Sequence, residues 1–238
     1  KEKKELYTAI LSFLESESDS EDEFSALVNI INDQEIIKSQ KSTIEIFQLL
    51  YILGENHHRA ADFFKRLGQI IQYLAKKPLL NENKEILDIY KRNKWLLLLL
   101  FEHKVIIPDE SILRYLMKNR DSNGQKLYYY FFSEIKDYLG KRKQKRIKYI
   151  IQQKFNENIE SFESKIKEGE NDSPICKLIR QDSIQEFVSY VSRTNLSLTS
   201  TIKPDFYESN TFLIENKPSL IEYAIFHGSI QVIKYLIN

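Results

Sequence analysis

Hydrophobic residues along this chain recur at the spacing of α-helices. In the first 75 residues, apolar side chains three and four positions apart form stripes on four successive segments. These stripes are Leu6, Ile10, Phe13 and Leu14; Phe24, Leu27, Val28 and Ile31; Ile46, Leu49, Leu50 and Leu53; and Phe63, Phe64, Leu67, Ile70, Ile71 and Leu74. Period-two alternation, which is typical of strands, is absent over any useful length. The pattern predicts an all-α fold of antiparallel helical hairpins with short loops.

The same spacing continues through the middle of the chain. Apolar residues between Ile86 and Tyr90, a short polar break, and the run Trp95 to Phe101 predict a helix, a tight turn and a buried helix. Pro108 and Asp109 open a further helix. From Ile147 to Ile166 the apolar residues step by three and four, which predicts one amphipathic helix of about 20 residues.

An acidic run interrupts the helical pattern from Glu15 to Glu23. Like charges at this density repel one another and favour a solvated loop between two helices. Ser16, Ser18 and Ser20 lie among the acids, so a patch of phosphoacceptor serines is the alternative interpretation.

A basic run extends from Lys141 to Lys148. It is consistent with the exposed face of a helix start, and it could also dock on an acidic protein surface or on a phosphate backbone. The whole chain has 35 Lys and Arg against 34 Asp and Glu, a net charge of +1, which argues against nucleic acid and favours an acidic protein. The candidate contact residues are Lys141, Arg142, Lys145 and Arg146.

Five consecutive aromatic residues, Tyr128 to Phe132, form the most unusual local feature. On a helix they would point in all directions, which predicts either a helix wedged between two layers or an exposed aromatic patch for a partner.

Compartment and membrane signals are few. The longest apolar run, Trp95 to Phe101, is far shorter than the roughly 20 residues of a spanning helix, and no secretory signal is present. A single cysteine suits a reducing compartment, so we expect a cytoplasmic protein without a membrane partner. The helical pattern runs up to Asn238, and we expect the natural protein to continue beyond it.

One internal repeat lies near the C-terminus. Ser173–Val191 aligns without a gap on Ser219–Ile237, at an offset of 46 residues. Two short helices repeated at a fixed offset predict a solenoid, in which each unit buries its apolar side against a neighbour.

The two units resemble the ankyrin repeat. Ser173-Pro174-Ile175-Cys176 matches its opening, and Ala224 and Gly228 match its small position and its turn glycine. Asp182 replaces that glycine in the first unit, and the long offset implies an insertion of about 13 residues between Thr194 and Lys217, which we expect to pack down. The resemblance implies protein binding through the positions before each turn, which are Arg180, Gln181, Phe226 and His227.

The wider chain is similar to ankyrin proteins of trichomonad flagellates, in which repeats follow an uncharacterised helical domain. This resemblance is carried by Tyr7–Leu14, Asn56–Arg59, Asn93–Leu100, Gly169–Ser173 and Lys217–Leu236. It implies a helical domain over 1–168, ankyrin-like repeats over 169–238, and no established activity.

Residues with catalytic or metal-binding chemistry are scattered. The neighbours His57 and His58 diverge on a helix, His103 and His227 are isolated, and no zinc-binding or redox motif occurs. Cys176 is expected to be a small buried hydrophobe. We therefore predict no metal, no cofactor and no enzymatic activity.

The leading functional hypothesis is a non-enzymatic scaffold or adaptor in the cytoplasm. Its partner is a protein, with the acidic tails of tubulin or another cytoskeletal protein as the specific candidate for the basic run. The alternatives are an architectural subunit of a larger assembly, and an enzyme or signalling effector.

Overall fold

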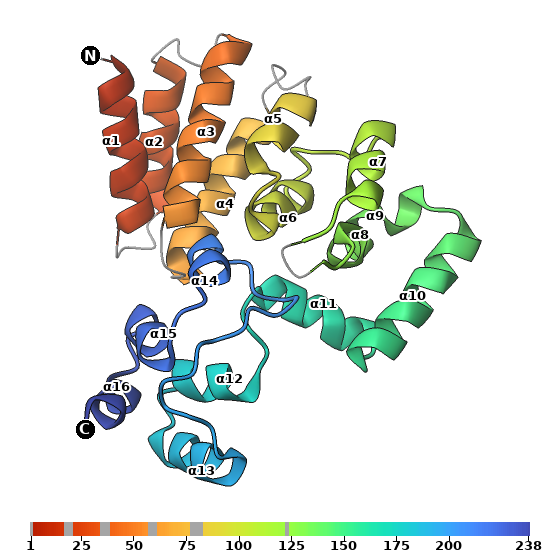
Figure 1. Ribbon diagram of the computed structural model, residues 1–238. Coiled ribbons are helices and arrows are strands. Elements are labelled where there is room, and N and C mark those ends of the chain that lie inside the picture. Colours follow the sequence, from red (N-terminus) through yellow and green to blue (C-terminus); the bar gives the residue numbers. More distant parts are fainter. Residues whose placement is uncertain (1, 17–20, 34–38, 57–60, 77–82, 122–123) are drawn as a thin grey trace. The chain divides into compact units, whose positions relative to one another are not determined.

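The computed structural model describes residues 2–16, 21–33, 39–56, 61–76, 83–121 and 124–238 (Figure 1). In these ranges every regular element is a helix, and β pairing is confined to the isolated bridges Arg120–Lys126 and Thr201–Ser219. The predicted all-α class is confirmed.

The chain divides into two compact units, residues 1–107 and 108–238. The boundary predicted at 168/169 lies within the second unit and stays a prediction. The first unit contains α1 (Glu2–Glu15), α2 (Glu21–Asp33), α3 (Gln40–Asn56), α4 (Ala61–Ala75), α5 (Asn83–Tyr90) and α6 (Lys94–Glu102). The second unit contains α7 (Glu110–Lys118), α8 (Leu127–Tyr130), α9 (Phe132–Ile135), a 3-10 turn (Lys136–Tyr138), α10 (Lys141–Phe155), α11 (Ile159–Glu168), α12 (Pro174–Arg180), α13 (Ile184–Thr194), α14 (Thr211–Asn216), α15 (Leu220–Phe226) and α16 (Ile230–Ile237).

The core of the first unit is made by the predicted apolar stripes. Helix α1 packs on α2 and α4, and α3 packs on α4, α5 and α6. The stripes of α1 and α4 are wholly buried, whereas Phe24, Val28, Leu49 and Leu53 are half-buried at the edges of theirs. Inside this core the Tyr90 hydroxyl donates a 2.8 Å hydrogen bond to the Phe47 carbonyl oxygen, so the phenol is buried without losing its polar partner.

The buried helix predicted at Trp95–Phe101 is confirmed as α6. The Asn93 side chain caps its start by accepting a hydrogen bond from Leu96 N at 3.0 Å. Gly54 of α3 lets this helix approach, because a Cβ added there would lie 2.8 Å from a methyl group of Leu96. A mostly apolar helix is stable here because neighbouring helices cover nearly all of its faces.

The acidic run is partly helical rather than wholly a loop. Glu21, Asp22 and Glu23 form the first turn of α2, where negative charge interacts favourably with the helix dipole. The carbonyl oxygen of Ser16 accepts a hydrogen bond from Arg66. Ser18 and Ser20 lie outside the described residues, so the phosphoacceptor interpretation stays a prediction.

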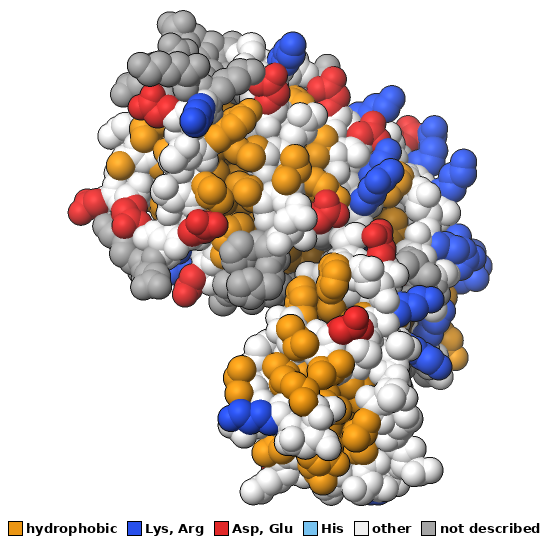
Figure 2. Space-filling view, turned by 60° about the vertical axis from the view of Figure 1, so that its left-hand side comes forward, with side chains coloured by type: hydrophobic (Ala, Val, Ile, Leu, Met, Phe, Trp, Pro, Cys, Tyr) orange, Lys and Arg blue, Asp and Glu red, His pale blue; other side chains and the backbone are white. Residues whose placement is uncertain are grey.

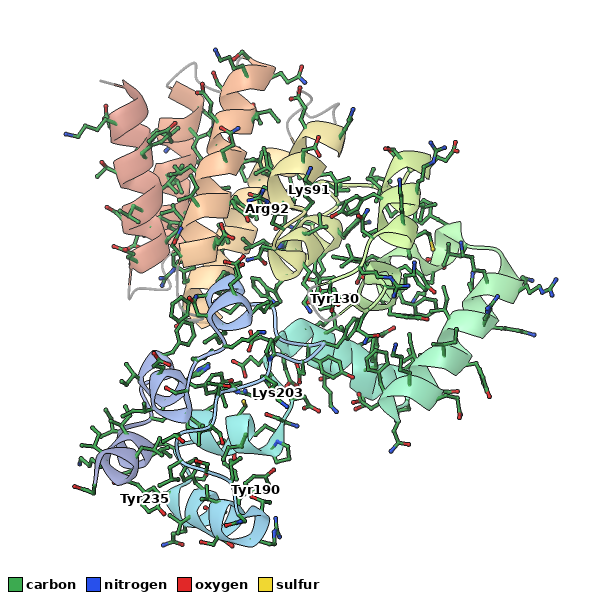
Figure 3. All side chains as sticks on the ribbon, in the orientation of Figure 1. Lys91, Arg92, Tyr130, Tyr190, Lys203 and Tyr235 are labelled. Carbon is green, nitrogen blue, oxygen red and sulfur yellow. The ribbon has the colours of Figure 1, made fainter. Side chains whose placement is uncertain are left out.

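Four of the five residues of the aromatic run are buried and Tyr128 is half-buried, so the exposed-patch interpretation is wrong. Tyr129 to Phe132 are at most 7% exposed, and the backbone breaks at Phe131 between α8 and α9. That break lets the rings face different neighbours. Tyr130, for example, donates a hydrogen bond to the Ile166 carbonyl oxygen of α11 at 3.3 Å (Figure 3).

The long helix predicted over Ile147–Ile166 is two helices, and this prediction is wrong. Asn156 ends α10 in the left-handed conformation, with φ 55°. The Asn158 side chain then starts α11 by accepting a hydrogen bond from Ser161 N at 2.7 Å. Because the apolar period continues across the break, periodicity alone could not locate it.

The repeated segments form two helix hairpins, α12–α13 and α15–α16. Helix α12 packs on α15, and α13 packs on α16 (Figure 1). Their turns are equivalent at the offset of 46. Asp182 and Gly228 have φ of 50° and 68°, while Ser183 and Ser229 have φ/ψ of −81°/76° and −80°/77°. The backbone hydrogen bonds of the turns repeat as well, since Ser183 N donates to Leu178 O and Ser229 N to Ala224 O.

The segment between the hairpins packs down, as predicted, and carries the unpredicted helix α14. Ile202, Phe206 and Tyr207 are buried, and Phe206 stacks on Phe162 of α11 at 5.9 Å between ring centroids. The insertion is therefore part of the core of the second unit.

Candidate interaction surfaces

The predicted basic run forms the first two turns of α10. The six cations of this run are exposed, and none of them pairs with a carboxylate in the part of the chain that the structure describes. They are Lys141, Arg142, Lys143, Lys145, Arg146 and Lys148. Figure 2 shows Lys and Arg side chains gathered at the right-hand edge of the view. We call these six residues the α10 basic face.

The basic face is electrostatically unfavourable for the helix that carries it. Lys141, Arg142 and Lys143 occupy the first turn without an acidic neighbour there, although the helix dipole favours negative charge at that end. Pairs such as Lys141 and Lys145 are four residues apart and repel one another. An acidic ligand would relieve both effects.

The rest of α10 holds the basic face in place. Ile147 and Ile151 are buried, and the helix packs on α11. The Gln144 amide fixes its start by donating hydrogen bonds of 2.8 Å to the carbonyl oxygens of Lys136 and Leu139. Tyr149, 63% exposed, adds an aromatic ring to the outer surface of the helix. The cations are thus presented from a fixed backbone.

The four hairpin residues predicted to bind a partner have different surroundings. The Arg180 side chain is only 13% exposed, and its guanidinium donates 2.8 Å hydrogen bonds to the carbonyl oxygen of Asn171 and to the hydroxyl of Tyr223. Its Nε also forms a 2.6 Å ion pair with Glu170. Gln181 is exposed, in the turn that follows Arg180. These contacts give Arg180 a structural role in joining the two hairpins, and its partner-binding role stays a prediction.

Phe226 and His227 are both half-buried on the second hairpin. Phe226 stacks on Phe212 of α14, with ring centroids 5.9 Å apart and planes 10° from parallel. The His227 ring lies 4.5 Å from that of Tyr223. Phe212 itself is 52% exposed, so the stacked pair of rings lies at the surface.

Three isoleucines of the second hairpin are far more exposed than the sequence suggested. Ile225, Ile230 and Ile237 have exposed fractions of 59%, 53% and 68%. The repeat predicted a solenoid in which each unit buries its apolar side against a neighbour, and these three residues belong to the second unit. The repeat offset identifies the residues of the first hairpin that occupy the same positions.

A buried polar cluster links α11 and the first hairpin to the insertion. The Glu208 carboxylate is 3% exposed and accepts hydrogen bonds from Asn171 N, Ser209 N and Asn210 N. Lys165 bridges Glu157 and Asp172 at 2.6 and 2.7 Å. Burial by itself would raise the pKa of Asp172, but the hydrogen bonds from Lys165 and Lys177 outweigh it and lower that pKa. The charges of this cluster are used in internal contacts that hold the insertion down.

The cysteine and the histidines considered for catalysis or metal binding have different surroundings. Cys176 is buried, and burial raises the pKa of its thiol to about 11, so it is a protonated core side chain at neutral pH. His103 packs against Gly68 of α4. His57 and His58 lie outside the described residues. Among the residues that are described, no three His, Cys, Asp or Glu side chains gather as a metal site.

Two further findings bear on the function. No helix in the described parts of the chain combines the length and the apolar character needed to cross a bilayer. Comparisons of the chain with family models, with curated proteins and with solved structures find no match, so the two resemblances drawn from its residues stay predictions.

Proposed function

We propose that this chain is a non-enzymatic protein-interaction scaffold, an adaptor that binds an acidic protein segment through the α10 basic face. The observation that carries the proposal is the set of six exposed cations on one helix, none of which pairs with a carboxylate of the described residues. Repulsion between uncompensated like charges lowers the stability of the folded protein, and a bound acidic segment would reduce that repulsion.

An acidic protein fits this surface better than nucleic acid does. The net charge of the chain is only +1, so the positive potential is local to α10 instead of extending over a long groove. A short, mobile acidic segment needs no more than such a local patch, and its affinity would fall with rising salt. The acidic tails of tubulin have this chemistry, which makes cytoskeletal attachment the specific form of the proposal.

The repeated hairpins would supply the scaffold part of the protein. Their equivalent turns and paired packing support an ankyrin-type stack that begins near Asn171 and follows a helical domain. In such a stack each unit is stabilised by its neighbour, which leaves helix faces and loop tips available for partners.

Co-sedimentation with microtubules tests the acidic-segment proposal. The charge-reversed protein K141E/R142E/K145E/R146E is expected to lose at least about tenfold in affinity, and wild-type binding should weaken steeply with salt. A matched control reverses four exposed lysines outside α10, K41E/K84E/K118E/K203E, and is expected to retain binding despite the same net charge.

Two further arms make the result decisive. Removing the tubulin tails by proteolysis should abolish binding, and a free polyglutamate peptide should compete for it. Equal pelleting of wild type and the α10 variant would refute the proposal. Tighter binding to a single-stranded RNA than to polyglutamate would instead assign the basic face to nucleic acid.

A further inference from the structure

Tyr149 is the one aromatic or apolar residue of α10 whose side chain faces solvent. The others are Ile147, Ile150, Ile151 and Phe155, which are buried or half-buried. The Tyr149 side chain is 63% exposed. An aromatic ring that stays in water contributes little to folding, and tyrosine is enriched among the residues that dominate binding at protein interfaces. Its place next to the α10 basic face makes it a candidate contact of the same partner.

Tyr149 continues a row of arginines along the helix. Residues three and four positions apart lie above one another on a helix, so Arg142, Arg146 and Tyr149 form one row, and all three are exposed. At a rise of about 1.5 Å per residue, Arg146 lies about 6 Å beyond Arg142 along the axis, and Tyr149 about 4.5 Å beyond Arg146. A ligand that lies along this row meets two guanidinium groups and then a phenol ring.

The neighbouring row has the same order of charged and neutral residues. It begins with Lys141, Lys145 and Lys148. The exposed amides of Gln152 and Gln153 then continue the lysine row and the arginine row. Lys154 lies on another side of the helix, where its Nζ is 6.0 Å from the ring of Tyr129. On the two rows positive charge therefore ends at Lys148, and the next turn, which carries Tyr149, is neutral.

An extended acidic segment matches the spacing of the arginine row. Alternate residues of an extended chain point to the same side and lie about 6.6 Å apart, close to the separation of Arg142 and Arg146. Two acidic side chains at alternate positions can therefore each meet an arginine, whose planar guanidinium binds carboxylates well. The next residue on that side reaches the neutral turn at Tyr149. A third acid would find no arginine there, whereas an aromatic ring would find another ring.

We propose that Tyr149 determines which acidic segments the α10 basic face selects. The preferred segment is extended and has the order acid-x-acid-x-aromatic, with its acids on Arg142 and Arg146 and its aromatic ring packed on Tyr149. This inference rests on the proposed function and deepens it, because it specifies the sequence of the bound segment and separates it from a uniformly acidic one.

Two fluorescently labelled peptides test the proposal on the full chain. One consists of Glu-Ser repeats followed by Phe, which places the ring in line with the acids, and in the other Ala replaces Phe. Fluorescence anisotropy at low salt measures both affinities, because salt screens the contacts that the peptides share. We expect the wild-type chain to bind the Phe peptide about fivefold more tightly than the Ala peptide, which is the effect of one aromatic pair.

Substitutions of Tyr149 should change this preference and little else. Tyr149→Ala is expected to weaken binding of the Phe peptide about fivefold and to leave the Ala peptide within about twofold. Tyr149→Phe keeps the ring and should keep the preference. The matched control is Tyr138→Ala, because Tyr138 is 50% exposed but precedes α10, and it should leave both affinities unchanged. Circular dichroism checks that all variants are folded.

The possible outcomes separate this inference from the proposed function. Equal binding of the two peptides by the wild-type chain, with both lost in K141E/R142E/K145E/R146E, would overturn the inference and leave the proposed function standing. Equal weakening of both peptides by Tyr149→Ala would have the same meaning. If neither peptide binds, the inference is refuted, and the proposed function is refuted with it only if polyglutamate also fails to bind.

Sedimentation of the wild-type chain examines a competing occupant of the Tyr149 ring. We expect a monomer at micromolar concentration. A dimer that Tyr149→Ala dissociates, and that Tyr138→Ala retains, would assign the ring to a second copy of the chain and would overturn the inference.

Discussion

The Asp182 carboxylate, in the turn of the first hairpin, accepts a 3.0 Å hydrogen bond from the amide of Val232 in the first turn of α16. The same carboxylate accepts a hydrogen bond from the amide of Gln231 at 2.9 Å. Asp182 stands where the second hairpin has Gly228, and like that glycine it has a positive φ. The departure from a glycine turn is therefore compensated by a cap on the neighbouring hairpin.

Substitution of Asp182 should separate the two effects. Asp182→Ala loses the cap and keeps the left-handed backbone, so we expect a loss of about 2 kcal/mol in the free energy of unfolding. Asp182→Gly also loses the cap but relieves the backbone strain, so the loss should be only about 1 kcal/mol or less. Urea unfolding of the full chain measures both, and an equal loss in the two variants would contradict this account.

The hydroxyl of Ser229 should matter far more than that of Ser183, although the two serines share one backbone conformation. Ser229 Oγ donates to the Ile179 carbonyl oxygen in a buried position, and its removal leaves that contact unmade. We expect Ser229→Ala to cost about 1–2 kcal/mol of unfolding free energy. Ser183→Ala is the matched control and should cost less than about 0.5 kcal/mol. Equal losses in urea unfolding would show that the inter-hairpin bond contributes nothing.

Neutralising Glu208 should loosen the insertion. Its buried carboxylate accepts hydrogen bonds from three backbone amides, one of them that of Asn171 at 3.3 Å. In Glu208→Gln the side chain loses its charge and turns an amide group toward these donors, so we expect a loss of roughly 2–3 kcal/mol. Faster hydrogen exchange at Ser209 and Asn210 would locate the effect. The exposed Glu215→Gln is the control and should leave exchange at both residues unchanged.

The stability of the first unit should fall as the solution becomes mildly acidic. Burial lowers the pKa of His103, although nearby Glu102 acts in the opposite direction. Because the unfolded chain then binds the proton more tightly, stability is complete above the unfolded pKa of about 6.5 and declines below it. His103→Gln is expected to flatten this decline. Urea midpoints at about pH 7.5 and pH 5.5 provide the measurement, and an unchanged decline in the variant would contradict the prediction.

Local sequence signals were sufficient for much of the helical layout. The stripes of α1 and α4, the buried α6 and the Asp109 cap of α7 all follow from spacing and from side-chain chemistry that act within one helix. The repeat was also visible in the sequence, because equivalent hairpins need similar residues at equivalent positions.

Apolar period and charge did not reveal the break at Asn156, the helical start of α2 at Glu21 or the helix α14. The break itself is local, because Asn156 is left-handed and the Asn158 side chain caps α11. The contact of Arg180 with the hydroxyl of Tyr223, 43 residues away, is one that only the tertiary structure reveals.

The sequence by itself determined that this chain is helical and that two of its segments are equivalent, because helix period, caps and turn residues act over a few positions. Only the tertiary structure decided which equivalent residues are covered. Ile179 and Ile225 are the same residue at the same place in the repeat, and one is buried while the other is 59% exposed. The physical reason is that a side chain at the surface of a hairpin is buried only where another element covers it. In this structure only the first hairpin has a second hairpin packed over these positions.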